Sequence, residues 1–141
     1  MKKIVKTKKV PKQYKFDIDH NPYEVLSYNT LSRNGKVIIF PIFHYEGSDQ
    51  YKDLLAPIID KGYHVITINF LSKADRVLFF NYYANVFKRL LNEFIQTKII
   101  KNEQIIFMGF GVGALLACYM QSLKLKDNLF IFNNFGLNKF V

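Results

Sequence analysis

The chain has 141 residues, of which 50% are hydrophobic, 16% aromatic and 22% charged. This length matches one typical domain. The hydrophobic content suffices for a buried core, so the composition excludes a fully disordered chain, a collagen-like fibre and a disulfide-stapled miniprotein. The single cysteine, Cys118, cannot form an internal disulfide, which favours a cytoplasmic setting. No apolar run approaches the ~18 residues needed to span a bilayer, and we therefore expect a soluble protein.

The net charge of +9 is concentrated at the N-terminus, where no acidic residue precedes Asp17. The lysines of this segment are Lys2, Lys3, Lys6, Lys8, Lys9, Lys12 and Lys15. We therefore divide the chain into a basic flexible arm at residues 1–13 and a domain at residues 14–141. Such an arm can attract nucleic acid or an anionic membrane through its charge, or it can remain a solvated terminus.

Beyond the arm, the sequence alternates between predicted strands and helices. The predicted strands are 14–18, 23–27, 36–43, 63–70, 104–108 and 128–132, and the predicted helices are 48–61, 72–97 and 114–123. The first two strands have alternating apolar residues around a turn at 19–22, which is typical of a β-hairpin. The later strands are nearly continuous apolar runs, which are typical of parallel strands buried on both faces. We predict an α/β fold with a mostly parallel sheet, an N-terminal antiparallel hairpin at one edge and helices on both faces.

Local signals support the predicted helix ends. Gly62 fits the position just after a helix, where a left-handed backbone conformation is common. Pro57 lacks an N–H group and should kink the second half of the same helix. Ser48 and Ser72 fit the N-cap position, where a hydroxyl accepts a hydrogen bond from a free backbone amide.

Three glycines, Gly109, Gly111 and Gly113, form a turn between a predicted strand and a predicted helix. In one interpretation the turn and the helix N-terminus hold a phosphate, since Gly109, Gly111 and Ala114 fit the pattern G-x-G-x-x-G/A. However, this is not the first strand–helix turn of the chain, and an asparagine occupies the position where an acidic residue should bind the ribose. In the other interpretation the turn is a nucleophile elbow of the form G-x-S-x-G.

Residues outside the turn support the elbow. The stretch FHYEGS at residues 43–48, the pair Gly62-Tyr63 and a strand ending at Asn69 resemble the start of an α/β-hydrolase. The chain is most similar to serine hydrolases of the lysophospholipase and monoacylglycerol-lipase type, over about residues 14–135. The resemblance implies a truncated, α/β-hydrolase-like three-layer sandwich. It also implies that backbone N–H groups of Val112 and of the Phe43–His44 turn would form the oxyanion hole.

The sequence departs from that family at the reacting atom. Gly111 stands at the position of the nucleophilic serine, and nucleophilic catalysis needs a hydroxyl or thiol activated by a base. The family places an acid and then a histidine after the serine, but Asp127 is the only acid after the turn and no histidine follows His64. We therefore predict a truncated, non-catalytic α/β-hydrolase-like protein, a pseudoenzyme. The alternatives are a part of a carboxylic ester hydrolase, such as a lipase or esterase, completed by another chain, and a nucleotide-binding module.

No other residue provides a clear catalytic group. Cys118 fits a buried apolar position, and His44 fits a loop residue, although it is the best candidate for a polar role near the turn. The three histidines His20, His44 and His64 are too scattered for a metal site, so we expect no metal and no cofactor.

The last predicted strand, Asn128 to Phe132, is apolar on both faces, and no later strand is predicted to cover its outer edge. An exposed apolar edge strand can pair with another chain. We therefore expect self-association or a complementing chain at this edge.

Overall fold

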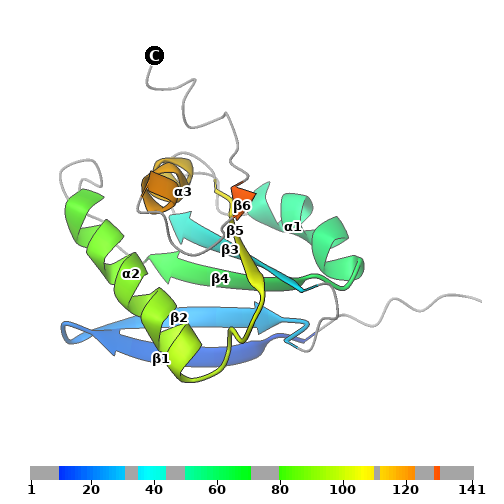
Figure 1. The fold of residues 1–141 in the computed structure, drawn as a ribbon, viewed down its shortest axis with the longest axis horizontal. Helices are drawn as coiled ribbons and strands as arrows, with labels where there is room; N and C mark the ends of the chain where they lie inside the picture. Colours follow the sequence, from blue (N-terminus) through cyan, green and yellow to red (C-terminus); the bar gives the residue numbers. More distant parts are fainter. Residues whose placement is uncertain are drawn as a thin grey trace, which may run out of the picture.

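The computed structural model describes residues 10–30, 35–43, 50–70, 80–109, 112–122 and 129–130, which form one sheet with helices packed on it (Figure 1). The elements are β1 (Lys12–Ile18), β2 (Asn21–Tyr28), β3 (Lys36–Phe43), α1 (Gln50–Asp60), β4 (His64–Phe70), α2 (Phe80–Gln96), β5 (Gln104–Phe107), α3 (Val112–Ser122) and β6 (Leu129–Phe130). The predicted order of strands and helices is confirmed.

The strands of the sheet follow the order β1-β2-β4-β3-β5-β6. β1 and β2 form an antiparallel hairpin, and β2 pairs antiparallel with β4. The pairs β4–β3, β3–β5 and β5–β6 are parallel. The predicted mostly parallel sheet with a hairpin at one edge is therefore confirmed. The parallel strands also give the sheet a carboxyl edge, where β3, β4 and β5 end, and an amino edge, where they begin.

Some predicted boundaries differ from the observed ones. β1 begins at Lys12, because the pairing of Lys12 with Ser27 extends the hairpin into the segment assigned to the basic arm. α3 begins at Val112, two residues before the predicted start. The predicted caps Ser48 and Ser72 lie outside the described residues. Of the predicted strand 128–132, the structure describes Leu129 and Phe130.

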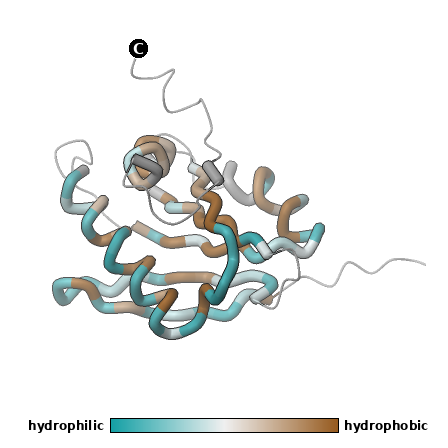
Figure 2. Tube along the Cα trace, in the orientation of Figure 1, coloured by the Kyte–Doolittle hydropathy of each residue, from teal (hydrophilic) through white to brown (hydrophobic). Residues whose placement is uncertain are grey.

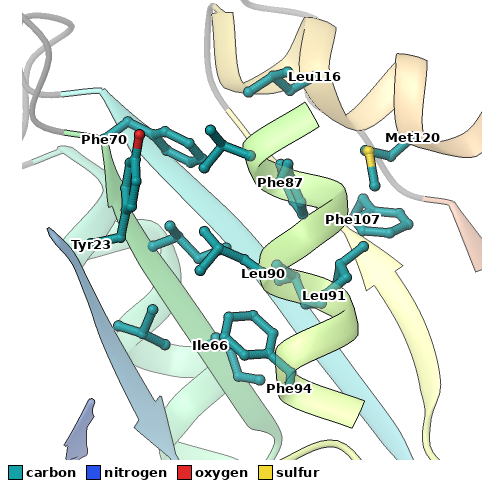
Figure 3. Packing of buried hydrophobic residues seen from close by; sticks show 14 of the residues in the cluster. Tyr23, Ile66, Phe70, Phe87, Leu90, Leu91, Phe94, Phe107, Leu116 and Met120 are labelled. Atoms are coloured by element: carbon teal, nitrogen blue, oxygen red, sulfur yellow. The ribbon is translucent and has the colours of Figure 1, made fainter. Parts of the chain in front are cut away.

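The larger core lies between the sheet and the two helices α2 and α3 (Figure 3). Phe87 of α2 is fully buried, and its ring lies 6.3 Å from the ring of Phe70 and 5.7 Å from that of Phe107, measured between centroids. Such aromatic pairs stabilise a fold by more than the burial of their surface area alone provides. α2 is thereby fixed over β4 and β5 through one central ring.

A smaller core lies on the opposite face of the sheet, beneath α1. Its fully buried members include Phe40 of β3, Leu55 of α1 and Val65 of β4. Residues of β3 and β4 alternate between the two cores, as expected for strands covered on both faces. Hydrophobic residues accordingly concentrate on the central strands and on α3, as Figure 2 shows. Helices on both faces of the sheet are thus confirmed.

α1 ends at the predicted glycine. Gly62 has a φ of +90°, and its N–H donates to the carbonyl of Ile59 at 2.9 Å, while the N–H of Tyr63 donates to the carbonyl of Ile58 at 3.4 Å. These two bonds form a Schellman motif, which satisfies carbonyls that the helix end leaves free. α1 continues through Pro57 to Asp60.

The hairpin turn between β1 and β2 contains two non-glycine residues in the left-handed region. Asp19 has a φ of 53° and His20 a φ of 66°, and the flanking residues Ile18 and Asn21 pair with each other. A two-residue turn of this kind is usually built with Asn-Gly or Asp-Gly. The carboxylate of Asp19 accepts a 2.8 Å hydrogen bond from Arg89 of α2, which ties the turn to the helix.

We predict that H20G stabilises the protein by about 1 kcal/mol, because glycine adopts a positive φ without steric cost. The His20 side chain is exposed, so its removal costs little. Urea unfolding of wild type and H20G checks this prediction, with H20A as the control that removes the imidazole and keeps the Cβ atom. Equal stability of H20G and H20A would show that the turn is unstrained.

Candidate functional site at the carboxyl edge

The glycine turn lies at the carboxyl edge of the sheet. β5 ends at Phe107, and α3 begins at Val112, so the turn connects β5 to a helix that covers the sheet. Open α/β sheets bind their ligands outside the carboxyl ends of their strands. The position of the turn therefore suits a functional site.

Gly109 is in tight contact with the first turn of α3. A Cβ atom at Gly109 would lie 2.5 Å from the carbonyl carbon of Gly113 and 2.9 Å from the amide nitrogen of Ala114. Both partners are backbone atoms, which cannot rotate away as the end of a flexible side chain can. Position 109 therefore requires glycine.

Gly113 makes a second close contact, with β3. A Cβ atom there would lie 3.0 Å from the carbonyl oxygen of Pro41 and 3.5 Å from the Cγ atom of Pro41. The two glycines thus allow α3 to start close to both β5 and β3. A nucleophile elbow needs this type of sharp strand–turn–helix connection, with small residues on both sides of the central residue.

The structure brings the ends of the two relevant strands together. β3 and β5 are paired in parallel, and the N–H of Met108 donates to the carbonyl of Ile39 at 3.1 Å. Phe43 is the last residue of β3 and Val112 the first of α3. Gly111 and His44 lie outside the described residues. The oxyanion-hole assignment of Phe43, His44 and Val112 remains a prediction.

Cys118 is half-buried on α3. Burial raises the pKa of its thiol, which keeps the sulfur protonated and weakly nucleophilic. This direction agrees with a packing role for Cys118.

The basic arm and the metal hypothesis can be compared with the structure only in part. Lys12 and Lys15 are exposed on β1, whereas the other five N-terminal lysines lie outside the described residues. Among the residues that the structure describes, no three His, Cys, Asp or Glu side chains come close enough to hold a metal ion. Within the same part of the chain, no helix is long and apolar enough to cross a membrane.

Sequence reasoning missed one group of polar residues at the amino edge. His64 is fully buried there, with its ring nitrogens bonded to Ser27 and Glu103. These partners are 37 and 39 residues away in the sequence. The only signal in the sequence is a histidine at the start of a largely apolar strand.

No protein-family model matches the sequence, and comparison with curated protein sequences finds no relative. Solved structures do resemble the fold. A thioesterase domain from the curacin biosynthetic pathway superposes with a TM-score of 0.65 at 16% identity, covering 87% of this chain and 46% of that domain. An alpha-beta serine hydrolase homologue from Coxiella burnetii gives 0.63 at 14% identity, covering 82% of this chain and 59% of that protein. The Pyrococcus furiosus esterase Pf2001 gives a TM-score of 0.59 at 20% identity, covering 79% of this chain and 46% of that esterase.

These similarities show that the chain has an α/β-hydrolase-like fold. The chain spans between 46% and 59% of the length of the three proteins. The fold expected from the sequence is therefore confirmed.

We predict that alanine at the two flanking glycines is tolerated unequally. G109A should destabilise the protein by about 3 kcal/mol or more, because its Cβ atom would overlap backbone atoms of α3. G113A should cost about 1 kcal/mol, because a shift of a few tenths of an ångström relieves its contact with Pro41. Urea unfolding measures both values, and equal costs would contradict the close packing at Gly109.

Proposed function

We propose that this chain is a non-catalytic α/β-hydrolase-like protein, in which the fold serves as a binding or assembly module. The observation that carries the proposal is the residue between the two packed glycines. Gly109 and Gly113 have the close contacts of an elbow, but Gly111 between them has no side-chain oxygen or sulfur. The two flanking glycines thus fit a nucleophile elbow whose central position carries no nucleophile.

Removal of the attacking atom eliminates the covalent step of a serine hydrolase, because no bond to the substrate carbonyl can form. Backbone donors alone can still stabilise a developing oxyanion. Triad proteases that lack a catalytic residue still accelerate the reaction by on the order of 10³–10⁴ relative to water, through such donors and through substrate binding. The proposal therefore allows weak hydrolysis without a covalent acyl-enzyme.

A fluorophosphonate probe tests the proposal. We expect no stoichiometric labelling of any serine in the folded wild-type chain and no burst of product with short acyl esters. Intact-protein mass spectrometry and peptide mapping provide the readout, with heat-unfolded protein as the background and an active serine hydrolase as the positive control. Stoichiometric labelling of a serine in the wild-type chain would overturn the proposal.

The variant G111S sharpens this experiment. It places a hydroxyl at the proposed elbow position, and C118S is the matched control, because it adds a serine within α3. We expect both variants to remain unlabelled, since a serine without an activating base is a weak nucleophile. Labelling of G111S at position 111 alone would instead favour the second candidate below.

The second candidate function is part of a carboxylic ester hydrolase that another chain completes. Two observations favour it: the chain covers about half of the compared hydrolases, and β6 stands at the end of the sheet order. Further strands from a second copy could pair with the outer edge of β6, as the apolar composition of Asn128 to Phe132 suggests. We do not propose nucleotide binding, because the glycine turn of dinucleotide-binding folds follows their first strand, whereas here it follows β5.

Sedimentation of the full chain over a range of concentrations tests this second candidate. It predicts a dimer that L129K weakens, because lysine on an edge strand opposes strand pairing. The matched control is Q13K, which places a lysine at the opposite edge of the sheet, on β1. A wild-type chain that stays monomeric, or a dimer that Q13K weakens as much as L129K, would exclude self-pairing through β6.

A further inference from the structure

A chain of hydrogen-bonded polar side chains lies at the amino edge of the sheet, far from the glycine turn. Ser27 Oγ lies 2.9 Å from His64 Nε2, and His64 Nδ1 lies 2.5 Å from Glu103 Oε2. This hydrogen-bonded network extends further at both ends. Ser27 Oγ lies 3.1 Å from Thr30 Oγ1, and the N–H of Lys101 donates to Glu103 Oε1 at 3.1 Å.

This network is shielded from water. Ser27 is 1% exposed and His64 is 0% exposed, while the side chain of Glu103 is 12% exposed. A buried charge is costly unless it is paired and hydrogen-bonded. The protonation states of His64 and Glu103 are therefore coupled to whether this part of the protein stays closed.

The contact between His64 and Glu103 crosses a strand. β3 lies between β4 and β5 in the sheet, with Val37 paired to His64 and Lys36 paired to Gln104. Glu103 thus reaches over the start of β3 and ties residues 97–103, which we call the α2–β5 connection, to β4. Opening of this connection would expose apolar core.

Opening would expose two adjacent isoleucines of the connection. Ile99 is 4% exposed and Ile100 is 2% exposed, and both belong to the larger core. The α2–β5 connection is therefore held both by apolar packing and by the polar network.

The geometry resembles a Ser-His-acid catalytic group, but the burial argues against catalysis. A nucleophile must reach the substrate carbonyl, and Ser27 lies within β2 with only 1% of its surface exposed. Its hydroxyl is also bonded to Thr30. The arrangement suits proton-dependent closure better than attack on a substrate.

The network can accommodate one proton on His64 without losing a hydrogen bond. With a neutral ring, Nδ1–H donates to Glu103, the Ser27 hydroxyl donates to Nε2, and the Thr30 hydroxyl donates to Ser27 Oγ. With a protonated ring, Nε2–H donates to Ser27 Oγ and the Ser27 hydroxyl turns to Thr30. The ionised carboxylate of Glu103 balances the ring charge in the second arrangement.

A further proton on Glu103 removes this balance and leaves a buried, uncompensated imidazolium. The charged residues on the elements around the network are Lys12 on β1, Glu24 on β2, Lys36 on β3, Asp60 and Lys61 at the end of α1, and Lys98 and Lys101 in the connection. The basic residues outnumber the acidic ones, which disfavours an additional positive charge there. We propose that Ser27, His64 and Glu103 form a proton-sensitive latch, which holds the α2–β5 connection closed while Glu103 is ionised and releases it in acid.

The variant E103Q tests the latch. Glutamine retains an acceptor for Nδ1–H but carries no negative charge, so protonation of the ring alone should release the connection. In wild type the connection opens only when Glu103 itself takes up a proton, so we expect release in E103Q at a higher pH than in wild type. Hydrogen exchange of the amides of residues 97–103 and binding of a hydrophobic dye measure the release.

The matched control is D19N, which removes the carboxylate of an exposed ion pair with Arg89. We expect the α2–β5 connection of D19N to open at the same pH as in wild type. An unchanged opening pH in E103Q, or an equal shift in D19N, would overturn the latch.

A measurement on the wild-type chain keeps the test decisive if E103Q does not fold. On acidification, the amides of residues 97–103 should lose protection before those of the central strands β3 and β4. Simultaneous loss of protection across the sheet would exclude a local latch. Fluorophosphonate labelling of Ser27 in the folded protein would also overturn it, because Ser27 would then be an accessible nucleophile.

Discussion

The close contact between Gly109 and the first turn of α3 determines how the second half of the described fold is built. The helix can leave β5 and lie directly over the sheet because a hydrogen atom, not a side chain, faces Gly113 and Ala114. From that start, Leu116 and Met120 reach the core beneath α2, where both are fully buried (Figure 3). A side chain at position 109 would displace α3 and open this core.

This packing requirement does not depend on the chemistry of the turn. The flanking glycines are needed because backbone atoms meet at Gly109 and at Gly113, whatever residue stands between them. Glycine at positions 109 and 113 is therefore needed for folding whether or not position 111 carries a nucleophile. The two glycines thus have a structural role of their own, and they alone are weak support for an active enzyme.

Much of the fold could be predicted from the sequence, because its signals are local. The apolar runs of β3 and β4 indicated buried parallel strands, and Gly62 indicated the end of α1. The start of β1 at Lys12 could not be predicted, because the strand there depends on pairing with Ser27. Lys12 does not continue the alternation of apolar residues that marks the rest of the strand. At the candidate site, the spacing of the three glycines predicted a tight turn, but the partner Pro41 depends on the position of β3 beside β5.

The polar network at the amino edge was hidden for a related reason. Its members come together because β4 lies between β2 and β3 in the sheet, an order that does not follow the sequence. In the same strand order, β3 takes part in two close contacts, one at each of its ends. At its amino end the pair of His64 and Glu103 crosses over Val37, and at its carboxyl end Gly113 packs on Pro41. The two contacts therefore lie at opposite ends of one strand. Ile39 connects the two regions, since it is fully buried in the larger core and its carbonyl accepts the N–H of Met108, the residue just before Gly109.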